Sequence, residues 1–300
     1  SPPLPPPITI RSKFFSTSFS FMPLQIASCV LVLISCGLFP ASQLNMKIAT
    51  WNVNSLNVRL RHVLEWLDIA NPNILVLQEI KQITEVFPAE AFAEAGYTGI
   101  SSGQKTYNGV AVISRNESTD HVTDFPGFED PQRRILACTI DGIRVVNIYV
   151  PNGSSLDSEK YVYKLNWLRA LKHFLQAEMK NHENLVVLGD FNIAPDDRDV
   201  YDPEKWGNDI LCSPQERGAL EEIIDLGLVD VFRNFDQPEK TYSWWDYRAA
   251  GFRRNAGLRI DLILASKTLS AICQASYIDR EPRTWERPSD HTPVIAEFSA

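Results

Sequence analysis

The sequence predicts an α/β fold from residue 46 onward, with two β-sheets packed against each other. Strand-like and helix-like patterns alternate over 46–300 without a stretch that resembles a linker, so we expect one domain there. A strand, a polar turn, a helix, a second strand and a terminal acid occur in that order twice. Because neither half is expected to cover its sheet alone, the two sheets should share one core.

The first half is predicted to open with a strand at 47–54 and a helix capped by Asn57. Leucines and a valine at helical spacing give this helix one apolar face, and Pro72 blocks its continuation. The next strand covers 74–77 and leads to Glu79. Three further strands, expected to be successive and antiparallel, cover 109–114, 134–140 and 144–150, and the Asp141-Gly142 turn joins the last two.

The second half repeats the pattern. The strand 144–150 ends in Asn152, a helix follows from about Ser158, and the strand 185–188 leads to Asp190. Three later elements are predicted: a helix that starts at the capping box Ser213-Pro214-Gln215-Glu216 and closes at Gly227, a strand through Asp261, and a strand at 293–298.

Composition sets limits on partners and compartment. A 300-residue chain with 44% apolar residues can bury a large core. The net charge of −8 argues against a uniformly basic surface, so a nucleic-acid partner requires basic residues gathered on one face. The five cysteines are odd in number and lack metal-ligand spacing, which favours a reducing, cytoplasmic location and argues against a structural zinc.

Residues 1–45 differ from the rest of the chain. A proline-rich start is followed by Arg11 and Lys13 and then by an apolar stretch without charge up to Lys47. Three interpretations compete: an upstream reading frame or gene-start error, an export signal or membrane anchor, and an integral part of the fold. We favour the first, because a well-formed strand begins at Met46, and treat 1–45 as an extension outside the domain.

Acids, amides and one histidine follow the apolar runs of the predicted strands. They are Asn52 and Asn54, Glu79, Asp190 and Asn192, Asp261, and Asp290 with His291. A polar residue at a strand end is ordinarily a solvated turn residue. Here several should collect at one rim of the sheet core, where clustered acids need a cation to neutralise them. Oxygen ligands beside a histidine suit Mg²⁺ or Mn²⁺ and the hydrolysis of a phosphate ester.

His291 is the histidine with functional neighbours, although a lone histidine is more often structural. Asp261, on another strand, can accept a hydrogen bond from the imidazole and make it more basic, so that a cationic His291 lies beside a phosphate oxygen. Asn192 should point to the same side as Asp190, two residues earlier. This pair can hold a nucleophilic water.

The segment 241–261 interleaves aromatic and basic side chains. Arginines neutralise phosphates, and exposed aromatic rings can stack in an opened duplex. An alternative is that Trp244 and the neighbouring Tyr247 belong to the core. Taken together, the segment is the best candidate for a DNA-facing surface, with Trp244, Trp245, Arg248, Arg253 and Arg254.

These motifs, in this order, resemble the exonuclease III family of apurinic/apyrimidinic (AP) endonucleases, within the DNase I-like endonuclease/exonuclease/phosphatase superfamily. The resemblance runs from Met46 to Phe298 and includes WNVNSL, LQEIK, NIYVPNG, GDFNIAP and SDHTPV. It implies a four-layer sandwich of two mixed β-sheets flanked by helices. It also implies Mg²⁺-dependent cleavage of double-stranded DNA at abasic sites or 3′ ends in base excision repair, by a monomer without a small organic cofactor.

The resemblance also assigns roles to residues. Glu79 resembles the principal metal ligand, with Asn52 and Asp290 close to the ion. Asp190 resembles the residue that activates water, and Asn192 the one that orients it. Further residues are expected at the phosphate or the DNA: Tyr149, and His291 with Asp261, at the reacting group, and Asn54, Lys81 and Lys105 on the DNA side. The number of metals is left open, so Asp190, Asn192 and His291 are also candidate ligands.

The sequence departs from the family motifs at two positions, and it leaves alternative substrates and functions to be distinguished. Ile80 and Ser55 replace the threonine and glycine common in the family, and the loop 201–212, which includes Cys212, leaves open the choice between abasic sites and blocked 3′ ends. A phosphatase of inositol phosphates or phospholipids, an unspecific DNase, and a catalytically silent DNA-binding module are alternative functions.

Overall fold

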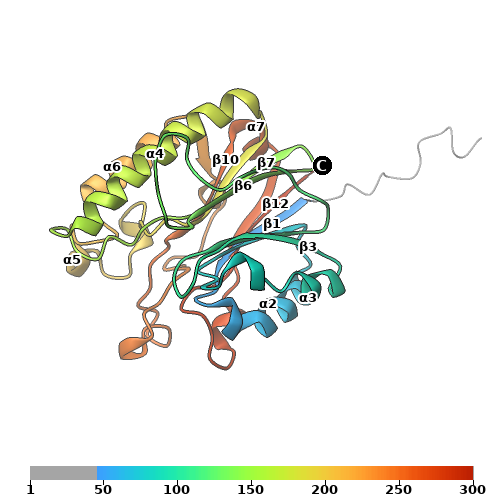
Figure 1. The fold of residues 1–300 in the computed structure, drawn as a ribbon. Helices are drawn as coiled ribbons and strands as arrows, with labels where there is room; N and C mark the ends of the chain where they lie inside the picture. Colours follow the sequence, from blue (N-terminus) through green and yellow to red (C-terminus); the bar gives the residue numbers. More distant parts are fainter. Residues whose placement is uncertain (1–45, 300) are drawn as a thin grey trace, which may run out of the picture. The chain divides into compact units, whose positions relative to one another are not determined.

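The computed structural model describes residues 46–299 and contains two six-stranded mixed sheets (Figure 1). The first sheet has the order β11 (Cys273–Ile278), β12 (Val294–Phe298), β1 (Met46–Asn52), β2 (Ile74–Gln78), β4 (Val110–Ser114) and β3 (Thr98–Ser102). The second has the order β5 (Thr119–Val122), β6 (Ile135–Ile140), β7 (Ile143–Tyr149), β8 (Leu185–Asp190), β10 (Asp261–Ser266) and β9 (Leu228–Asp230).

Helices form the outer layers, which confirms the predicted four-layer sandwich (Figure 1). The helices α2 (Leu56–Ala70) and α3 (Ala89–Glu94) pack on the first sheet, and α4 (Glu159–Asn181) and α6 (Pro214–Ile224) pack on the second. Two short helices complete the set, α5 (Pro203–Trp206) and α7 (Lys267–Ala271). The capping box at the start of α6 is present with both of its hydrogen bonds, although α6 ends at Ile224, three residues before the predicted Gly227.

The apolar runs are strands that are buried on both faces, as predicted. In β2, Ile74 and Val76 face the core between the sheets, whereas Leu75 and Leu77 face the helix α2. Successive side chains on a strand point to opposite faces, so a strand covered on both sides needs apolar residues at every position.

The repeated strand-helix-strand order corresponds to two equivalent parallel units. In the first unit β1 pairs with β2 in parallel, and in the second β7 pairs with β8 in parallel. One prediction was wrong: β4 is not next to β6 but lies between β2 and β3 in the first sheet, whereas β6 and β7 belong to the second. The turn at Asp141 joins β6 and β7 as predicted. A local strand pattern does not identify the neighbouring strand in the sheet when the chain crosses from one sheet to the other between two strands, as it does between β4 and β6.

The predictions for residues 1–45 concern a segment outside the described residues. Within 46–299, none of the helices combines the length and the apolar character needed to cross a bilayer.

Candidate active site

The layer between the two sheets changes from apolar to polar along its strands. On β8, Val186 and Leu188 face the other sheet, and the next residue in the same alternation is Asp190. On β2, Val76 is followed in the same way by Gln78. In the first sheet the parallel strands β1 and β2 end side by side, and in the second sheet β7 and β8 do the same. A hydrogen bond between Asn52 at the end of β1 and Asp190 at the end of β8 shows that both sets of polar termini lie at one end of this layer. The sequence rule that polar residues follow apolar runs therefore locates the site.

Three buried polar residues join the sheets beneath the site. The Nε2 of Gln78 donates to Oγ1 of Thr50 at 2.9 Å and to Oδ1 of Asn147, on the second sheet, at 2.8 Å. The Nδ2 of Asn147 donates to the carbonyl oxygens of Leu77 and Ala111, on the first sheet. These residues are 0% exposed, so the bonds are shielded from water and hold the two sheets in register.

Asn52 links carboxylates from the two sheets. Its Nδ2 donates to Oε1 of Glu79 at 3.0 Å and to Oδ2 of Asp190 at 2.9 Å. The hydroxyl of Tyr149 also donates to Oε1 of Glu79, at 2.9 Å. Four predicted site residues therefore lie together, although long stretches of sequence separate them.

Glu79 is held as a carboxylate by a neighbouring cation. The Nζ of Lys81 lies 2.8 Å from Oε2 of Glu79, and it also donates to Oδ1 of Asn54. Burial acts to raise the pKa of Glu79, but the charge and the hydrogen bond of Lys81, together with the Asn52 hydrogen bond and the charge of His291, lower this pKa. Glu79 and Lys81 both have positive φ angles, 52° and 53°, which bring these alternate side chains of the turn together.

Asp190 is the buried acid of the site, at 1% exposure. Its Oδ1 accepts from the main-chain N–H of Asn192 at 2.9 Å, and the Nδ2 of Asn192 approaches its Oδ2 at 3.3 Å. Burial raises the pKa of Asp190 to about 7, although the charge of His291 acts to lower it. Asp190 can therefore exchange a proton near neutral pH.

His291 has the predicted contact with Asp261. Its Nδ1 lies 2.9 and 3.1 Å from the two carboxylate oxygens of Asp261, and its Nε2 lies 3.8 Å from Oδ2 of Asp190. Burial acts to lower the pKa of His291, but the charges of Asp261 and Asp190 raise it to about 10. The imidazole is therefore cationic at neutral pH, with Asp261 as its buried counter-ion.

Asp290 lies at the rim of the site. It accepts a hydrogen bond from Nδ2 of Asn54 at 2.8 Å and another from Nε1 of Trp244 at 3.0 Å. Burial acts to raise the pKa of Asp290, but the charge of His291 and these two bonds lower it. Asp290 is thus an ionised oxygen donor close to the other acids.

The residues present fit a divalent cation. Side-chain atoms of Asp190, Asp261 and His291 that could bind a metal lie within 4.8 Å of one another, although the cationic His291 would have to lose a proton to act as a ligand. The carboxyl groups of Glu79 and Asp190 share the amide of Asn52, and both are negatively charged when Asp190 is ionised. Carboxylate and amide oxygens are the donors that Mg²⁺ and Mn²⁺ take in proteins, and a cation would offset this negative charge.

Asn152 is a site residue that our sequence predictions did not include. Its Nδ2 donates to Oδ1 of Asn192 at 3.0 Å. A signal was present in the sequence, because Asn152 follows β7 as Asn192 follows β8, and the two parallel strands end side by side.

The aromatic and basic segment is only partly exposed. Arg248, Arg253 and Arg254 are exposed, and so is Lys105 on a separate loop. Trp244 is partly buried and belongs to the wall of the site, where its ring lies 6.4 Å from that of His291.

Trp245 requires a correction. It is 0% exposed, its Nε1 donates to Oδ1 of Asn255 at 3.1 Å, and a Cβ atom at Gly257 would lie 2.5 Å from that nitrogen. Trp245 therefore anchors its loop and is not accessible to DNA in this structure. The sequence pattern of aromatic residues did not show that Trp245 is buried whereas Trp244 is partly exposed.

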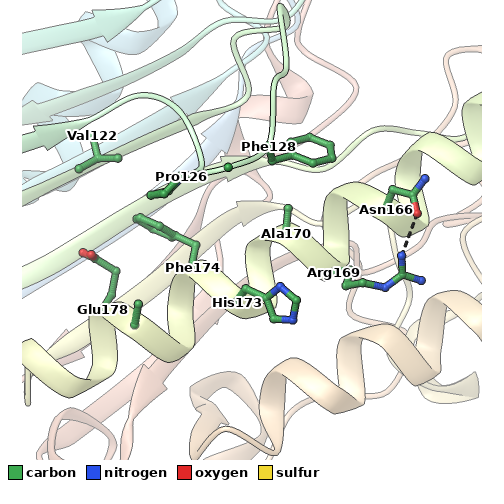
Figure 2. A pocket seen from close by; sticks show the side chains of 11 residues that line it. Val122, Pro126, Phe128, Asn166, Arg169, Ala170, His173, Phe174 and Glu178 are labelled. Atoms are coloured by element: carbon green, nitrogen blue, oxygen red, sulfur yellow. Dashed lines mark hydrogen bonds between the residues drawn. The ribbon is translucent and has the colours of Figure 1, made fainter.

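Two hollows have different surroundings. One, of about 480 Å³, adjoins the site and is lined in part by Tyr149, Asn152, Arg134 and Lys160. The other, of about 490 Å³, lies between α4 and the segment 122–128 (Figure 2). Its lining includes Phe174 and Phe128 and none of the polar strand-end residues, so it is separate from the candidate active site.

Comparisons with known proteins agree on one family. The model described as "Endonuclease/Exonuclease/phosphatase family" matches residues 49–291. Exodeoxyribonuclease III of Haemophilus influenzae is 35% identical over 266 residues, which cover 84% of this chain and 100% of that protein.

Solved structures agree with this result. The 3′ phosphatase NExo from Neisseria, in a complex with a product DNA hairpin, is 50% identical with a TM-score of 0.84, and an AP endonuclease from Archaeoglobus fulgidus is 41% identical with a TM-score of 0.82. Each alignment covers 85% of this chain and 100% of the other.

Proposed function

The chain belongs to the endonuclease/exonuclease/phosphatase family, with exodeoxyribonuclease III among its relatives, and on this premise we propose that it is a Mg²⁺-dependent DNA repair nuclease. It hydrolyses phosphodiesters of double-stranded DNA at abasic sites and at blocked 3′ ends, as a step of base excision repair. One observation carries the proposal: buried Asp190 contacts Asn192 and faces cationic His291, while Glu79 approaches from the other sheet. The four-layer, DNase I-like fold positions all of them.

Asp190 activates the attacking water. A carboxylate whose pKa is about 7 is partly ionised at neutral pH and is a stronger base than an ordinary aspartate. Asn192 is held against it by two hydrogen bonds, so its amide is placed to orient the water and to interact with a phosphoryl oxygen. The water attacks phosphorus in line with the leaving oxygen, and its proton moves to Asp190.

His291 and Tyr149 act on the phosphate side. Cationic His291 is fixed by Asp261 and donates from Nε2 to a phosphate oxygen as negative charge develops. A protonated imidazole has no free lone pair, which favours a donor role for His291 over that of a metal ligand. Burial and the charge of Glu79 raise the pKa of Tyr149 well above its usual value, so its hydroxyl keeps its proton as a donor near the leaving 3′ oxygen.

Glu79, Asn52 and Asp290 would hold the Mg²⁺ or Mn²⁺ ion, and Asp190, Asn192 and His291 border the same space. When bound, the cation supplies Lewis-acid polarisation of the phosphate and neutralises charge on the leaving oxygen. The ionised state of Glu79, maintained by Lys81, is the protein's own contribution to this site.

DNA approaches across the rim of the site. Lys81, Lys105 and the exposed Arg248, Arg253 and Arg254 supply positive charge on an otherwise acidic protein. Asn54 and Trp244, which both donate hydrogen bonds to Asp290, contact the DNA strand near the phosphodiester that is cleaved. We also propose that residues 46–300 act as one catalytic domain, because the acting side chains named above all lie within them, and that the protein is a cytoplasmic monomer. The odd number of cysteines without metal-ligand spacing supports a reducing compartment.

One assay tests this function. The wild type is given an abasic duplex, a 3′-phosphate primer and a soluble inositol phosphate, each with Mg²⁺ and each with EDTA. We expect cleavage of one or both DNA substrates with Mg²⁺ and none with EDTA. Release of phosphate from the inositol compound without any cut in DNA would refute the proposal in favour of a small-molecule phosphatase.

Two histidine variants locate the activity. His291→Ala should lower turnover by about 10²- to 10⁴-fold, the contribution typical of a positioned acid-base or charged group. The matched control is His173→Ala, which removes an exposed histidine on the outer side of α4 and should leave the rate unchanged. Equal rates for the two variants would contradict the assigned site.

A further inference from the structure

We propose that Lys164 is a positioning residue that holds Asn192 and Asn152 through their main-chain carbonyl groups. Lys164 lies on α4 and is 0% exposed. Its Nζ donates to the carbonyl oxygen of Asn192 at 2.7 Å and to that of Asn152 at 3.2 Å, and it forms a buried ion pair with Glu216. The inference rests on the proposed function, in which Asn192 orients the attacking water.

The two carbonyl groups belong to the turns that present the amides to the site. The Nδ2 of Asn152 donates to Oδ1 of Asn192, whose own Nδ2 donates to the carbonyl oxygen of Val150 at 3.0 Å. Asn192 has a φ of 50°, in the left-handed region that non-glycine residues rarely occupy. Such a conformation persists only where neighbouring contacts determine it, and Lys164 supplies one of them from outside the turn. Loss of this contact would let the Asn192 amide move relative to Asp190.

The ion pair itself is a poor explanation for the burial of Lys164. A buried pair loses the hydration of both charges, and its replacement by neutral side chains is often neutral or stabilising. Burial lowers the pKa of Lys164, while the charge of Glu216 opposes this shift. Two of the contacts of the Lys164 ammonium group are with main-chain carbonyl groups of site residues. This arrangement is better explained if Lys164 positions the Asn192 and Asn152 turns than if it stabilises the fold.

Glu216 connects Lys164 to the loop 201–212. Besides the ion pair, its carboxylate accepts from the main-chain N–H of Leu211 at 3.1 Å and from that of Ser213 at 3.0 Å. The hydroxyl groups of Ser213 and Tyr161 also form a hydrogen bond, with 2.6 Å between their oxygen atoms. The start of α6, the end of this loop and the Asn192 turn are therefore joined through one pair of buried charges.

The test is a mutant cycle on the abasic duplex. Lys164→Met with Glu216→Gln removes both charges without leaving one buried and unpaired. We expect kcat to fall about 10- to 100-fold with KM changed by less than about twofold, the size of loss that a small misplacement causes. The same pair of substitutions in an Asn192→Ala background should cause no further loss, because the group that Lys164 positions is already absent.

A second buried pair provides the matched control. Arg144 is 2% exposed, is paired with Glu178, and lies at the end of β7 opposite to Tyr149. Arg144→Met with Glu178→Gln should leave kcat unchanged. An unchanged kcat in the Lys164 variant, or an equal loss with and without Asn192, would overturn the positioning role.

Folding and the proposed function are checked separately. Thermal melts by circular dichroism establish that each variant is folded. If the Lys164→Met pair does not fold, Lys164→Gln with Glu216→Gln is judged by the same criteria, and failure of both to fold would make the pair a folding determinant and the proposal wrong. A wild type that cuts no DNA refutes the proposed function. An active wild type with an unaffected Lys164 variant refutes only the positioning role.

Discussion

Glu79 and Asp190 both lie at the end of the second strand of a parallel strand-helix-strand unit, one in each half of the domain, yet their surroundings shift their pKa values in opposite directions. Glu79 directly follows β2, whereas Asp190 is the last residue of β8 and pairs with Tyr149 of β7. Glu79 is paired with Lys81, which lowers its pKa, whereas burial raises the pKa of Asp190 to about 7. The repeated fold brings two acids to one rim, and the neighbours of each acid then decide its chemistry.

This difference separates two tasks that one kind of side chain could not perform together. An acid that stays ionised suits a cation, and an acid that titrates near neutral pH suits proton transfer from water. Substitutions at Asp190, Glu79 and Lys81 test whether cation binding and proton transfer are separated in this way.

Asp190→Asn should cause the largest loss. An amide cannot take a proton from water, so we expect turnover to fall by about 10³- to 10⁴-fold, at the upper end for general-base catalysis. The loss should persist at high Mg²⁺, because the missing function is proton transfer. Single-turnover cleavage of an abasic duplex measures it, and recovery of the rate on adding Mg²⁺ would contradict the assigned role.

Glu79→Gln should behave in the opposite way toward Mg²⁺. We expect a loss of about 10²-fold at low Mg²⁺, which corresponds to roughly 2.7 kcal/mol of transition-state stabilisation. Raising the Mg²⁺ concentration should restore part of the rate, since a neutral amide still offers an oxygen ligand. A rate independent of Mg²⁺ over the same range would remove Glu79 from the cation site.

Lys81→Met tests the cause of the difference between the acids. Without Lys81, burial dominates and the pKa of Glu79 should rise, so the acid limb of the pH-rate profile at limiting Mg²⁺ should move to higher pH. We expect kcat/KM at neutral pH to fall about tenfold, equivalent to about 1.4 kcal/mol. Lys105→Met removes an exposed lysine and should leave the acid limb in place. The same movement in both variants would assign the effect to DNA binding.

The free energy of unfolding should respond to pH with opposite signs at the two acids. The folded-state pKa of Asp190 is raised, so its contribution is fully present below about pH 4 and is lost as pH rises through about 7. The folded-state pKa of Glu79 is lowered, so its contribution is present above its ordinary value of 4.5 and is lost on acidification. Denaturant titrations of metal-free wild type, Asp190→Asn and Glu79→Gln measure this. Wild type should lose stability relative to Asp190→Asn between pH 4 and 7. Relative to Glu79→Gln, wild type should gain stability as pH rises toward 4.5, and the gain should be complete above that pH.

Much of the fold was predictable because both faces of most central strands are covered. The apolar runs located β1, β2, β4, β7 and β8, and the starts predicted at Ser158 and Ser213 were confirmed for α4 and α6. The predicted cap Asn57 was wrong, because α2 begins at Leu56 and Asn57 lies within it. The strands that were missed lie at sheet edges or are short, such as β3 and β9, and have fewer buried positions to give a pattern. Partner choice was also missed for β4, because it depends on contacts that a local pattern does not contain.

The sequence predicted which side chains meet in the candidate site better than it predicted their pKa values. The rule for strand ends, together with the family resemblance, gathered Asn52, Glu79, Asp190 and His291. It did not identify Asn152, and it could not indicate that Trp245 is buried. The unequal pKa values were not predictable, since they arise from burial and from the short distance between Lys81 and Glu79, which only the folded chain defines.

Direct titration of the two carboxyl groups tests the central claim. Carbon-13 NMR of metal-free protein labelled at aspartate and glutamate carboxyls, with Asp190→Asn and Glu79→Gln for assignment, follows each group with pH. We expect Asp190 to titrate near pH 7 and Glu79 to titrate below its ordinary value of 4.5. Two acids that titrate together in the ordinary range, or in the reverse order, would contradict it.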